Sequence, residues 1–354
     1  RDGVRWVRLH PAGVGSAAFW TRHAWPVARR LWRTVRRAGV VHAATSHNLW
    51  RPIEILALVY ARLLGRSSVC VVDMDLRDDA RMNYATGRWS AKSMLLCRWV
   101  YDPLRSLQLR WAVRACSLVL LKSRALCRDY GRDRASVRYF LDAAYEVRHL
   151  IPAADFARKW NALASPGQPL ELVCCGRLTA YKGVDRCIRA VAHAYHGGAA
   201  PLRLTVLGSG EQAEELARLC ASLGVAHLVE FRGALPYGPR LFEALYPLHL
   251  ALAAPLSEDT PRSTLDAFAC GIPTLAFDTR YYSDLASSGA VDVVPWPSIE
   301  RLAERIAWYA ADKRHVRAPA RAALEFARGN TQEAWLQKRV DWTLALGRAA
   351  PRAA

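Results

Sequence analysis

The sequence predicts an α/β protein made of two doubly wound domains. Short apolar runs rich in β-branched residues alternate with amphipathic stretches of helical length. This pattern is typical of parallel strands that are buried on both faces and joined by helices. Pro, Gly and Ser cluster in residues 164–169, between two sets of such runs, and 354 residues are enough for two hydrophobic cores.

Each half of the chain contains its own series of predicted strands. In the first half the apolar runs are 4–9, 39–45, 67–74 and 116–123. In the second half they are 170–176, 202–208, 228–233, 248–254 and 272–277. The helical stretches between them make each half a repeated βα unit, so both halves are predicted to fold as Rossmann-like domains.

The domain boundaries follow from these runs. We expect residues 1–150 to form one domain, 151–168 a linker or hinge, and 169–330 a second domain. Residues 331–354 are expected to form a C-terminal helix that packs back on the first domain. Ligands of such sheets bind beyond the carboxyl ends of the strands, so the two domains are expected to face each other across a ligand-binding cleft.

The net charge of +19 is concentrated in the first half of the chain. Residues 1–150 hold 27 Lys and Arg against 11 Asp and Glu, whereas the remainder holds 23 against 20. This asymmetry indicates an anionic partner for the first half, such as a membrane surface, a phosphorylated acceptor or nucleic acid. Solubility without a specific partner is the alternative. Because no recognised nucleic-acid-binding motif accompanies the charge, we expect no nucleic-acid partner.

Two basic stretches favour a membrane surface. In residues 24–38 the apolar side chains Val27, Leu31 and Val35 fall on one helical face and five arginines on the opposite face. Residues 87–116 interleave three tryptophans with Lys and Arg, as in interfacial segments. The alternative for both is a packed apolar face with a solvated basic face. We expect a cytoplasmic protein, peripheral at the inner face of the cytoplasmic membrane.

Other features limit the class of protein. The sequence has no apolar run long enough for a transmembrane helix and no visible signal peptide. Its nine cysteines are irregularly spaced and form no Cys-x-x-Cys pair. They are expected to be free thiols in a reducing compartment, and no metal site is expected.

The chemistry is concentrated in residues 257–277, where a predicted strand leads into a helix. Thr260 is a good N-cap and Pro261 suits the first helical position, so Glu258 is expected just before the helix and Asp266 inside it. Carboxylates at these two places can accept hydrogen bonds from sugar hydroxyls and from ribose hydroxyls on either side of a diphosphate.

A diphosphate also needs cations and backbone donors. Arg177 and Lys182 follow the predicted strand 170–176 and supply a planar guanidinium and a point charge. The N–H groups of residues 261–263, at the start of the helix, are expected to favour a phosphate through the helix dipole.

Two glycine-containing loops complete the predicted site. Gly208 and Gly210 lie between a strand and an acidic helix start, which alone is a weak signal for ligand binding. Gly233 lies in the loop 229–236, which is expected to hold a base through backbone contacts.

These motifs together resemble a known family. They read Gly-Arg-Leu-x-x-x-Lys-Gly, Leu-Gly-x-Gly-x-x-x-x-x-Leu, Phe-x-Gly and Glu-x7-Asp, followed by Ala-Cys-Gly-Ile-Pro. The arrangement is similar to that of retaining GT-B glycosyltransferases of the family four type, the group 1 glycosyl transferases. The resemblance is strong over residues 168–310 and weaker over 39–76.

The resemblance implies a role for each matching residue. Arg177 and Lys182 would bind the diphosphate of a nucleotide-sugar donor, Glu258 the donor-sugar hydroxyls and Asp266 the ribose. Backbone groups near Ser263 and Thr264 would meet the phosphates or the sugar. The resemblance further implies a metal-independent hexosyltransferase without a cofactor, acting on a cell-envelope, lipid-linked or exopolysaccharide acceptor.

The sequence departs from the family in several places. The second carboxylate is usually Glu and is here the shorter Asp266, and the loop after Glu258 reads Asp-Thr-Pro-Arg instead of carrying glycines. The usual first strand and Gly-rich loop are expected to be absent, unless residues 10–19 replace the loop. Where many members have a His, this chain has Met74 between Asp73 and Asp75, and one of these aspartates or Arg77 is expected to take over its contact, with Asp75 as the candidate. The expected catalytic residues are therefore Glu258, Arg177, Lys182 and Asp75.

Three other functions remain open. One is a nucleotide-sugar epimerase of the same fold, and another is a non-catalytic homologue that only binds the donor. The third is nucleic-acid binding, suggested by charge alone. The Asp73-Met74-Asp75 sequence also fits the metal motif of the other large glycosyltransferase fold, GT-A, but the motifs of the second half favour the metal-independent fold.

Overall fold

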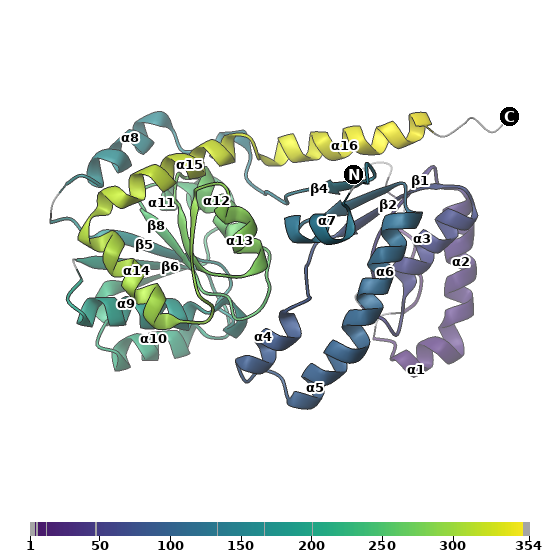
Figure 1. The fold of residues 1–354 in the computed structure, drawn as a ribbon, viewed down its shortest axis with the longest axis horizontal. Helices are drawn as coiled ribbons and strands as arrows, with labels where there is room; N and C mark the ends of the chain where they lie inside the picture. Colours follow the sequence, from purple (N-terminus) through teal and green to yellow (C-terminus); the bar gives the residue numbers. More distant parts are fainter. Residues whose placement is uncertain are drawn as a thin grey trace. The chain divides into compact units, whose positions relative to one another are not determined.

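The chain forms two compact units, each built around its own parallel sheet (Figure 1). The structure is a computed structural model that describes residues 4, 6–11, 13–46, 48–132, 134–165, 167–199 and 201–349. Unit 1 comprises residues 1–80, 90–140 and 338–354, and unit 2 comprises residues 81–89 and 141–337.

Unit 1 contains a four-stranded sheet in the order β1-β2-β3-β4, with every neighbouring pair parallel. The strands are β1 (Val40–Ala44), β2 (Ser67–Val72), β3 (Leu118–Leu121) and β4 (Val137–Tyr139). The α-helices are α1 (Ser16–Ala18), α2 (Ala24–Arg36), α3 (Ile53–Leu63), α5 (Ala91–Leu96), α6 (Asp102–Ala115) and α7 (Arg124–Tyr130). Two π-helical turns, η1 (Phe19–His23) and η2 (Cys97–Tyr101), precede α2 and α6, and α4 (Asp79–Ala85) crosses into unit 2.

Three of the four strands predicted in the first half are confirmed as β1, β2 and β3. The strand predicted at 4–9 is wrong, because its described residues, 4 and 6–9, are not in a strand. Val4 is 67% exposed and Trp6 is 90% exposed, and of the described apolar residues of this run only Leu9 packs against a core cluster. The three-residue strand β4 was not predicted, since it is too short to give a periodic pattern.

Unit 2 contains a six-stranded parallel sheet in the order β10-β9-β8-β5-β6-β7. The strands are β5 (Leu170–Cys175), β6 (Leu202–Leu207), β7 (Val229–Gly233), β8 (Leu250–Ala253), β9 (Thr274–Phe277) and β10 (Val291–Val294). The α-helices are α8 (Ala153–Ala162), α9 (Val184–His196), α10 (Ala213–Ser222), α11 (Pro239–Leu245), α12 (Arg262–Ala269), α13 (Arg280–Ala286), α14 (Ile299–Ala311) and α15 (Arg317–Arg328). Short 3-10 turns are η3 (Val147–His149), η4 (Ala180–Lys182), η5 (Ala226–Leu228) and η6 (Lys313–Val316).

All five strands predicted in the second half are confirmed, and β10 is an additional one. Their apolar side chains form the main core of unit 2 together with α9 and α14, including Leu172, Leu204, Leu250 and Ile306. The strand order reverses at β5. The chain moves outward from β5 to β7 and then returns to place β8 on the other side of β5. The carboxyl ends of β5 and β8 therefore form a topological switch point, where α/β sheets bind ligands.

The segment 151–168 is packed onto unit 2, which differs from the linker expected there. It contains α8, and the ammonium of the buried Lys159 donates a hydrogen bond to the carbonyl oxygen of Cys270 at 2.6 Å. The division between the units falls at residues 140 and 141 instead. The C-terminal helix α16 (Gln332–Ala349) begins in unit 2 and belongs to unit 1 from Lys338 onward.

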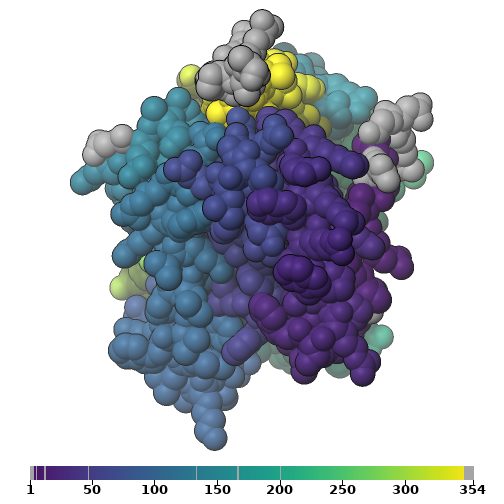
Figure 2. Space-filling model, turned by 90° about the vertical axis from the view of Figure 1, so that its right-hand side faces the viewer, coloured from purple at the N-terminus to yellow at the C-terminus, as the bar shows by residue number. Residues whose placement is uncertain are grey.

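The surface of unit 1 is rich in arginines and exposed aromatic side chains. Figure 2 shows one face of the molecule in space-filling form, with residues of the N-terminal half in purple to blue. In α2, Val27, Leu31 and Val35 are buried, and Leu31 and Val35 belong to a core cluster that includes Ala57 and Ala61 of α3. The apolar face of this helix is therefore packed on its own unit. None of the helices in the described part of the chain has the length and hydropathy of a membrane span.

Candidate functional site

A pocket lies at the switch point of unit 2, beyond the carboxyl ends of β5 and β8. Gly176 and Arg177 line it from the loop after β5, and Pro255 lines it from the loop after β8. Ser263 and Thr264, in the first turn of α12, also line it. We call this feature the switch-point pocket.

Glycine allows the two loops of the switch-point pocket to approach each other. Gly183, which starts α9, has φ +65°, and a Cβ there would lie 1.8 Å from the carbonyl oxygen of Ala254. No side chain fits so close to a backbone oxygen. The glycine therefore lets the loop that carries Lys182 lie directly on the loop after β8.

The two predicted cations share an aromatic neighbour. The Arg177 guanidinium donates a hydrogen bond to the Tyr181 hydroxyl and lies 5.7 Å from the centroid of its ring. The Lys182 ammonium lies 5.4 Å from the same centroid. Tyr181 thus holds both cations on one side of the switch-point pocket, a role that the sequence did not reveal.

Lys182 forms an ion pair with the carboxylate of Asp259, which also lines the switch-point pocket. Both side chains are largely shielded, with 24% of Lys182 and 21% of Asp259 exposed. Asp259 lies directly after Glu258, in the loop whose sequence departs from the family pattern, and no role for it was predicted.

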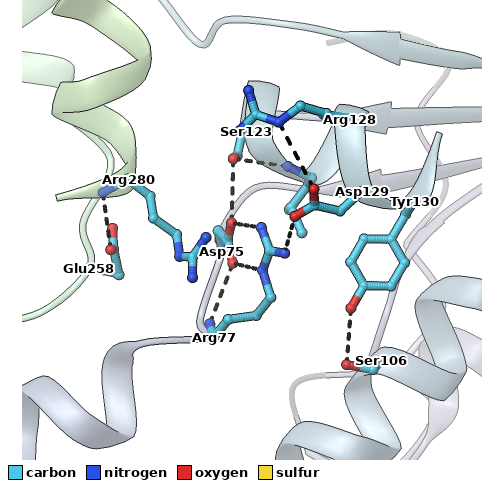
Figure 3. Close-up of polar contacts among 10 residues, drawn as sticks. Asp75, Arg77, Ser106, Ser123, Arg128, Asp129, Tyr130, Glu258 and Arg280 are labelled. Atoms are coloured by element: carbon cyan, nitrogen blue, oxygen red, sulfur yellow. Dashed lines mark hydrogen bonds and ion pairs between the residues drawn. The ribbon is translucent and has the colours of Figure 1, made fainter. Parts of the chain in front are cut away.

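Glu258 is buried, with 3% of its surface exposed. Its Oε1 accepts a hydrogen bond from the backbone N–H of Arg280 at 3.2 Å, at the start of α13 (Figure 3). The carboxylate therefore lies at the N-terminus of α13.

Asp266 is buried in the second turn of α12. It accepts a hydrogen bond of 2.8 Å from the hydroxyl of Tyr237. Burial raises the pKa of Asp266 to about 6, although the Tyr237 hydrogen bond and the nearby Arg262 act in the opposite direction. This carboxyl group can therefore change its charge near neutral pH.

The start of α12 differs from the prediction. The helix begins at Arg262 with Pro261 at the N-cap, and Thr260 does not cap it with its side chain. Pro261 has no N–H group, and the N–H of Arg262 donates to the Thr260 carbonyl oxygen at 2.8 Å. Of the three backbone donors expected at 261–263, this leaves Ser263 at the switch-point pocket, with Thr264 following it.

The predicted glycines tie neighbouring loops together. A Cβ on Gly208 would lie 1.7 Å from the Gly176 carbonyl oxygen, and one on Gly210 would lie 2.3 Å from that of Leu178. The N–H of Gly208 donates to the carbonyl oxygen of Gly233 at 2.8 Å. Gly208 therefore allows close contact between the loops, and its N–H is engaged within the protein; its role in binding a donor stays a prediction.

Asp75 belongs to unit 1, where it lies after β2 and is buried. Its two carboxylate oxygens accept hydrogen bonds from the Arg77 guanidinium at 2.8 and 2.6 Å, and the same guanidinium contacts Asp129 (Figure 3). These carboxylates raise the pKa of Arg77. Asp75 and Arg77 line a second pocket, at the carboxyl ends of β1 and β2, together with Tyr130.

The structure thus brings Arg177, Lys182, Ser263 and Thr264 to one pocket. Glu258 and Asp266 are not among its lining residues. Glu258 precedes the lining residue Asp259 in the chain, and Asp266 lies two residues after Thr264 in α12. The sequence patterns did not indicate the residues that hold these groups, namely Tyr181, Tyr237, Asp259 and Arg280. Only Asp259 had a signal, as an acid at a position where glycine is usual.

The switch-point pocket is lined by the two cations and by the hydroxyl groups of Ser263, Thr264 and Tyr282. Among the described residues, no group of three or more His, Cys, Asp or Glu side chains could hold a metal ion. All nine cysteines are free thiols, and seven of them are buried.

Comparison with known proteins supports a function in glycosyl transfer. Residues 155–326, slightly less than half of the chain, match the family model described as glycosyl transferases group 1. A comparison with curated protein sequences finds no match.

Several solved structures share the fold across both units. Alr3699/HepE from Anabaena, solved in complex with UDP, has a TM-score of 0.65 at 16% identity, covering 90% of this chain and 82% of its own. A glycosyltransferase from Rickettsia africae has a TM-score of 0.63 at 11% identity, covering 97% and 85%. WaaG, a glycosyltransferase involved in lipopolysaccharide biosynthesis, has a TM-score of 0.55 at 18% identity, covering 89% and 94%. The two parallel-sheet α/β units therefore have the GT-B fold.

Proposed function

We propose that this GT-B chain is a retaining, metal-independent glycosyltransferase that uses a nucleotide-diphosphate sugar as its donor. The observation that carries the proposal is the switch-point pocket, where Arg177, Lys182 and the first turn of α12 line one cavity. The family match over residues 155–326 and the structural relatives, one of them solved with UDP, support it.

The two cations of the pocket suit a diphosphate leaving group, which gains negative charge during transfer. When the bond between the anomeric carbon and the diphosphate oxygen breaks, its electron pair stays on the diphosphate. The Arg177 guanidinium and the Lys182 ammonium, together with the N-terminus of α12, would stabilise this charge.

The carboxylates fit hydroxyl groups on either side of the diphosphate. Glu258, buried and held by the Arg280 N–H, would accept hydrogen bonds from the donor sugar. Asp266, with Tyr237 beside it, would accept from the ribose. Holding the sugar in this way would place its anomeric carbon next to the acceptor oxygen. If the anomeric configuration is retained, the acceptor oxygen attacks the anomeric carbon from the same face as the departing diphosphate. A phosphate oxygen of the donor then takes the proton of the acceptor hydroxyl.

A ligand panel and one substitution test the proposal. Nucleotide sugars with different bases and sugars would be compared in a thermal-shift assay, in which a tight ligand raises the melting temperature. With the best donor, we expect Lys182→Ala to lower turnover or donor affinity at least tenfold, because the diphosphate loses its cation. Arg186→Ala, which removes a cation paired with Asp185 outside the switch-point pocket, is the control. Equal losses in the two variants would count against this site.

The epimerase and the donor-binding homologue predict other products. An epimerase would convert the donor in the absence of any acceptor, whereas a transferase needs an acceptor for a new glycoside. A donor-binding homologue would raise its melting temperature with the donor and release no nucleoside diphosphate.

We propose that the acceptor is a cell-envelope, lipid-linked or exopolysaccharide glycan, and that unit 1 adsorbs to the inner face of the cytoplasmic membrane. The surface suited to this is the α5–η2–α6 segment, whose exposed apolar side chains include Leu96 (50% exposed), Trp99 (72%) and Leu107 (63%). Lys92, Arg98 and Arg110 are exposed on the same segment, so it combines apolar area with positive charge.

A further inference from the structure

The ion pair between Lys182 and Asp259 places a carboxylate at the cation that a diphosphate needs. Both side chains line the switch-point pocket, and each is about four-fifths shielded from solvent. A diphosphate that binds Lys182 must therefore displace the Asp259 carboxylate or share the ammonium with it.

Asp259 is a departure of this chain from the family pattern, because the family usually carries glycines in this loop. A glycine would leave Lys182 available at all times. The Asp259 carboxylate instead neutralises the Lys182 ammonium while the pocket is empty. Because this carboxylate belongs to the same chain, it pairs with Lys182 again as soon as the ligand leaves.

We propose that Asp259 is an internal competitor for Lys182, which weakens diphosphate binding and speeds release of the diphosphate product. This inference rests on the proposed function and adds a regulatory residue to its site. The donor is a diphosphate diester, and transfer breaks its bond to the sugar. The acceptor oxygen bonds to the anomeric carbon, and the acceptor proton passes through a phosphate oxygen to solvent. The product therefore carries one more negative charge next to Asp259, and repulsion between the two favours its release.

Inorganic pyrophosphate is a suitable probe, because it contains the group that competes with Asp259 and no sugar or base. Its affinity would be measured by isothermal titration calorimetry for the whole chain and for Asp259→Asn at constant ionic strength. We expect the variant to bind pyrophosphate about three- to tenfold more tightly. Lys182→Ala is expected to abolish binding in either background.

A matched control separates competition from a general change of charge. Asp292 also forms an ion pair in unit 2, with Arg305, is 25% exposed and does not line the switch-point pocket. Asp292→Asn removes the same charge and is expected to leave the affinity for pyrophosphate unchanged. Melting temperatures of all variants, measured without ligand, would show that they are folded.

The outcomes separate this inference from the proposed function. If Asp259→Asn binds pyrophosphate more weakly than the unaltered chain, Asp259 positions Lys182 and the competitor role is overturned. Equal affinity, or no binding by any variant, overturns it as well. Tighter binding by Asp259→Asn without sugar transfer from any nucleotide sugar would support the competition at Lys182 and refute the transferase.

Discussion

At the scale of single residues, the two site carboxylates differ in environment. Glu258 accepts a backbone hydrogen bond at the start of α13, whereas Asp266 is buried beside a tyrosine hydroxyl and has its pKa raised to about 6. Both were predicted from their spacing in the sequence. The difference between their environments was not predicted, because it depends on residues distant in the chain. Tyr237 lies 29 positions from Asp266, and Arg280 lies 22 positions from Glu258.

The raised pKa of Asp266 predicts a pH-dependent affinity for the donor. A ribose hydroxyl donates to the ionised carboxylate, so protonation below pH 6 should weaken binding. Between pH 7 and pH 5 we expect donor affinity to fall by up to about tenfold. A nucleotide sugar is the right ligand, since its diphosphate diester does not titrate in this range. In Asp266→Asn, affinity should be low at pH 7 and vary little with pH. An unaltered chain whose affinity is constant from pH 5 to 7 would contradict this role.

Gly208 is required by the close approach of two loops. It has φ +151°, and a Cβ would meet the Gly176 carbonyl oxygen at 1.7 Å, so Gly208→Ala must shift backbone. We expect a loss of about 2–4 kcal/mol in the free energy of unfolding, measured by urea denaturation. Gly198→Ala is the control, because Gly198 also has a positive φ of +83° but has open space around its Cβ position. If both variants lose the same free energy of unfolding, backbone strain at positive φ, and not the clash with the Gly176 carbonyl oxygen, causes the loss.

At the scale of elements, long apolar runs were easier to predict than helix starts. Each of the five strand predictions in unit 2 is confirmed. Four of these runs are uninterrupted and largely buried, whereas β7, at the edge of the sheet, is mostly exposed. The start of α12 was placed one residue early, since propensity favours Thr260 as N-cap while the loop geometry puts Pro261 there. That residue matters, because it decides which backbone donors reach the switch-point pocket.

A buried histidine just before β8 predicts how the folding stability of the protein depends on pH. His249 precedes β8, is buried, and accepts a hydrogen bond from the Glu171 N–H at 3.1 Å. Burial, with Lys159 and Lys313 nearby, lowers its pKa from 6.5 to about 3. Between pH 3 and pH 6.5 this histidine binds a proton in the unfolded chain but not in the folded one. The free energy of unfolding therefore has its full value above pH 6.5 and falls as the pH is lowered toward 3, by at most about 1.4 kcal/mol per pH unit.

His249→Asn tests this dependence, because Asn keeps an acceptor and does not titrate. We expect the melting temperature of the unaltered chain to fall more steeply from pH 6.5 to 4 than that of the variant. His227→Asn, at an exposed histidine of the same unit, should keep the steep profile. Parallel profiles for the unaltered chain and His249→Asn would show that His249 is not responsible.

At the scale of the whole molecule, the sequence was sufficient for the fold class but not for the division into units. The alternation of apolar runs and helices predicted two parallel-sheet domains, and the GT-B fold is confirmed by the solved relatives. Composition placed a linker at 151–168, whereas α8 packs on unit 2 through Lys159 and Phe156. Only long-range contacts distinguish a packed helix from a linker, and they are not visible in local composition.

The charge asymmetry between the two halves leads to a prediction for the whole chain. Unit 1 carries most of the excess positive charge, and its α5–η2–α6 segment exposes Leu96 and Trp99 next to basic residues. We expect the chain to co-sediment with vesicles that contain anionic lipid, less strongly as salt increases. The double variant Leu96→Ser/Trp99→Ser should bind at least about tenfold more weakly, because it loses the apolar area that enters the interface.

A control variant distinguishes binding through this surface from nonspecific adsorption by any exposed tryptophan. Trp308 lies in unit 2 and is 39% exposed, so Trp308→Ser also removes an exposed tryptophan and should leave vesicle binding unchanged. The contribution of charge is tested by comparing anionic with purely zwitterionic vesicles. Equal sedimentation with both kinds of vesicle, or an equal loss in Trp308→Ser, would refute adsorption through unit 1. The excess arginines would then serve solubility, which is the alternative that the sequence left open.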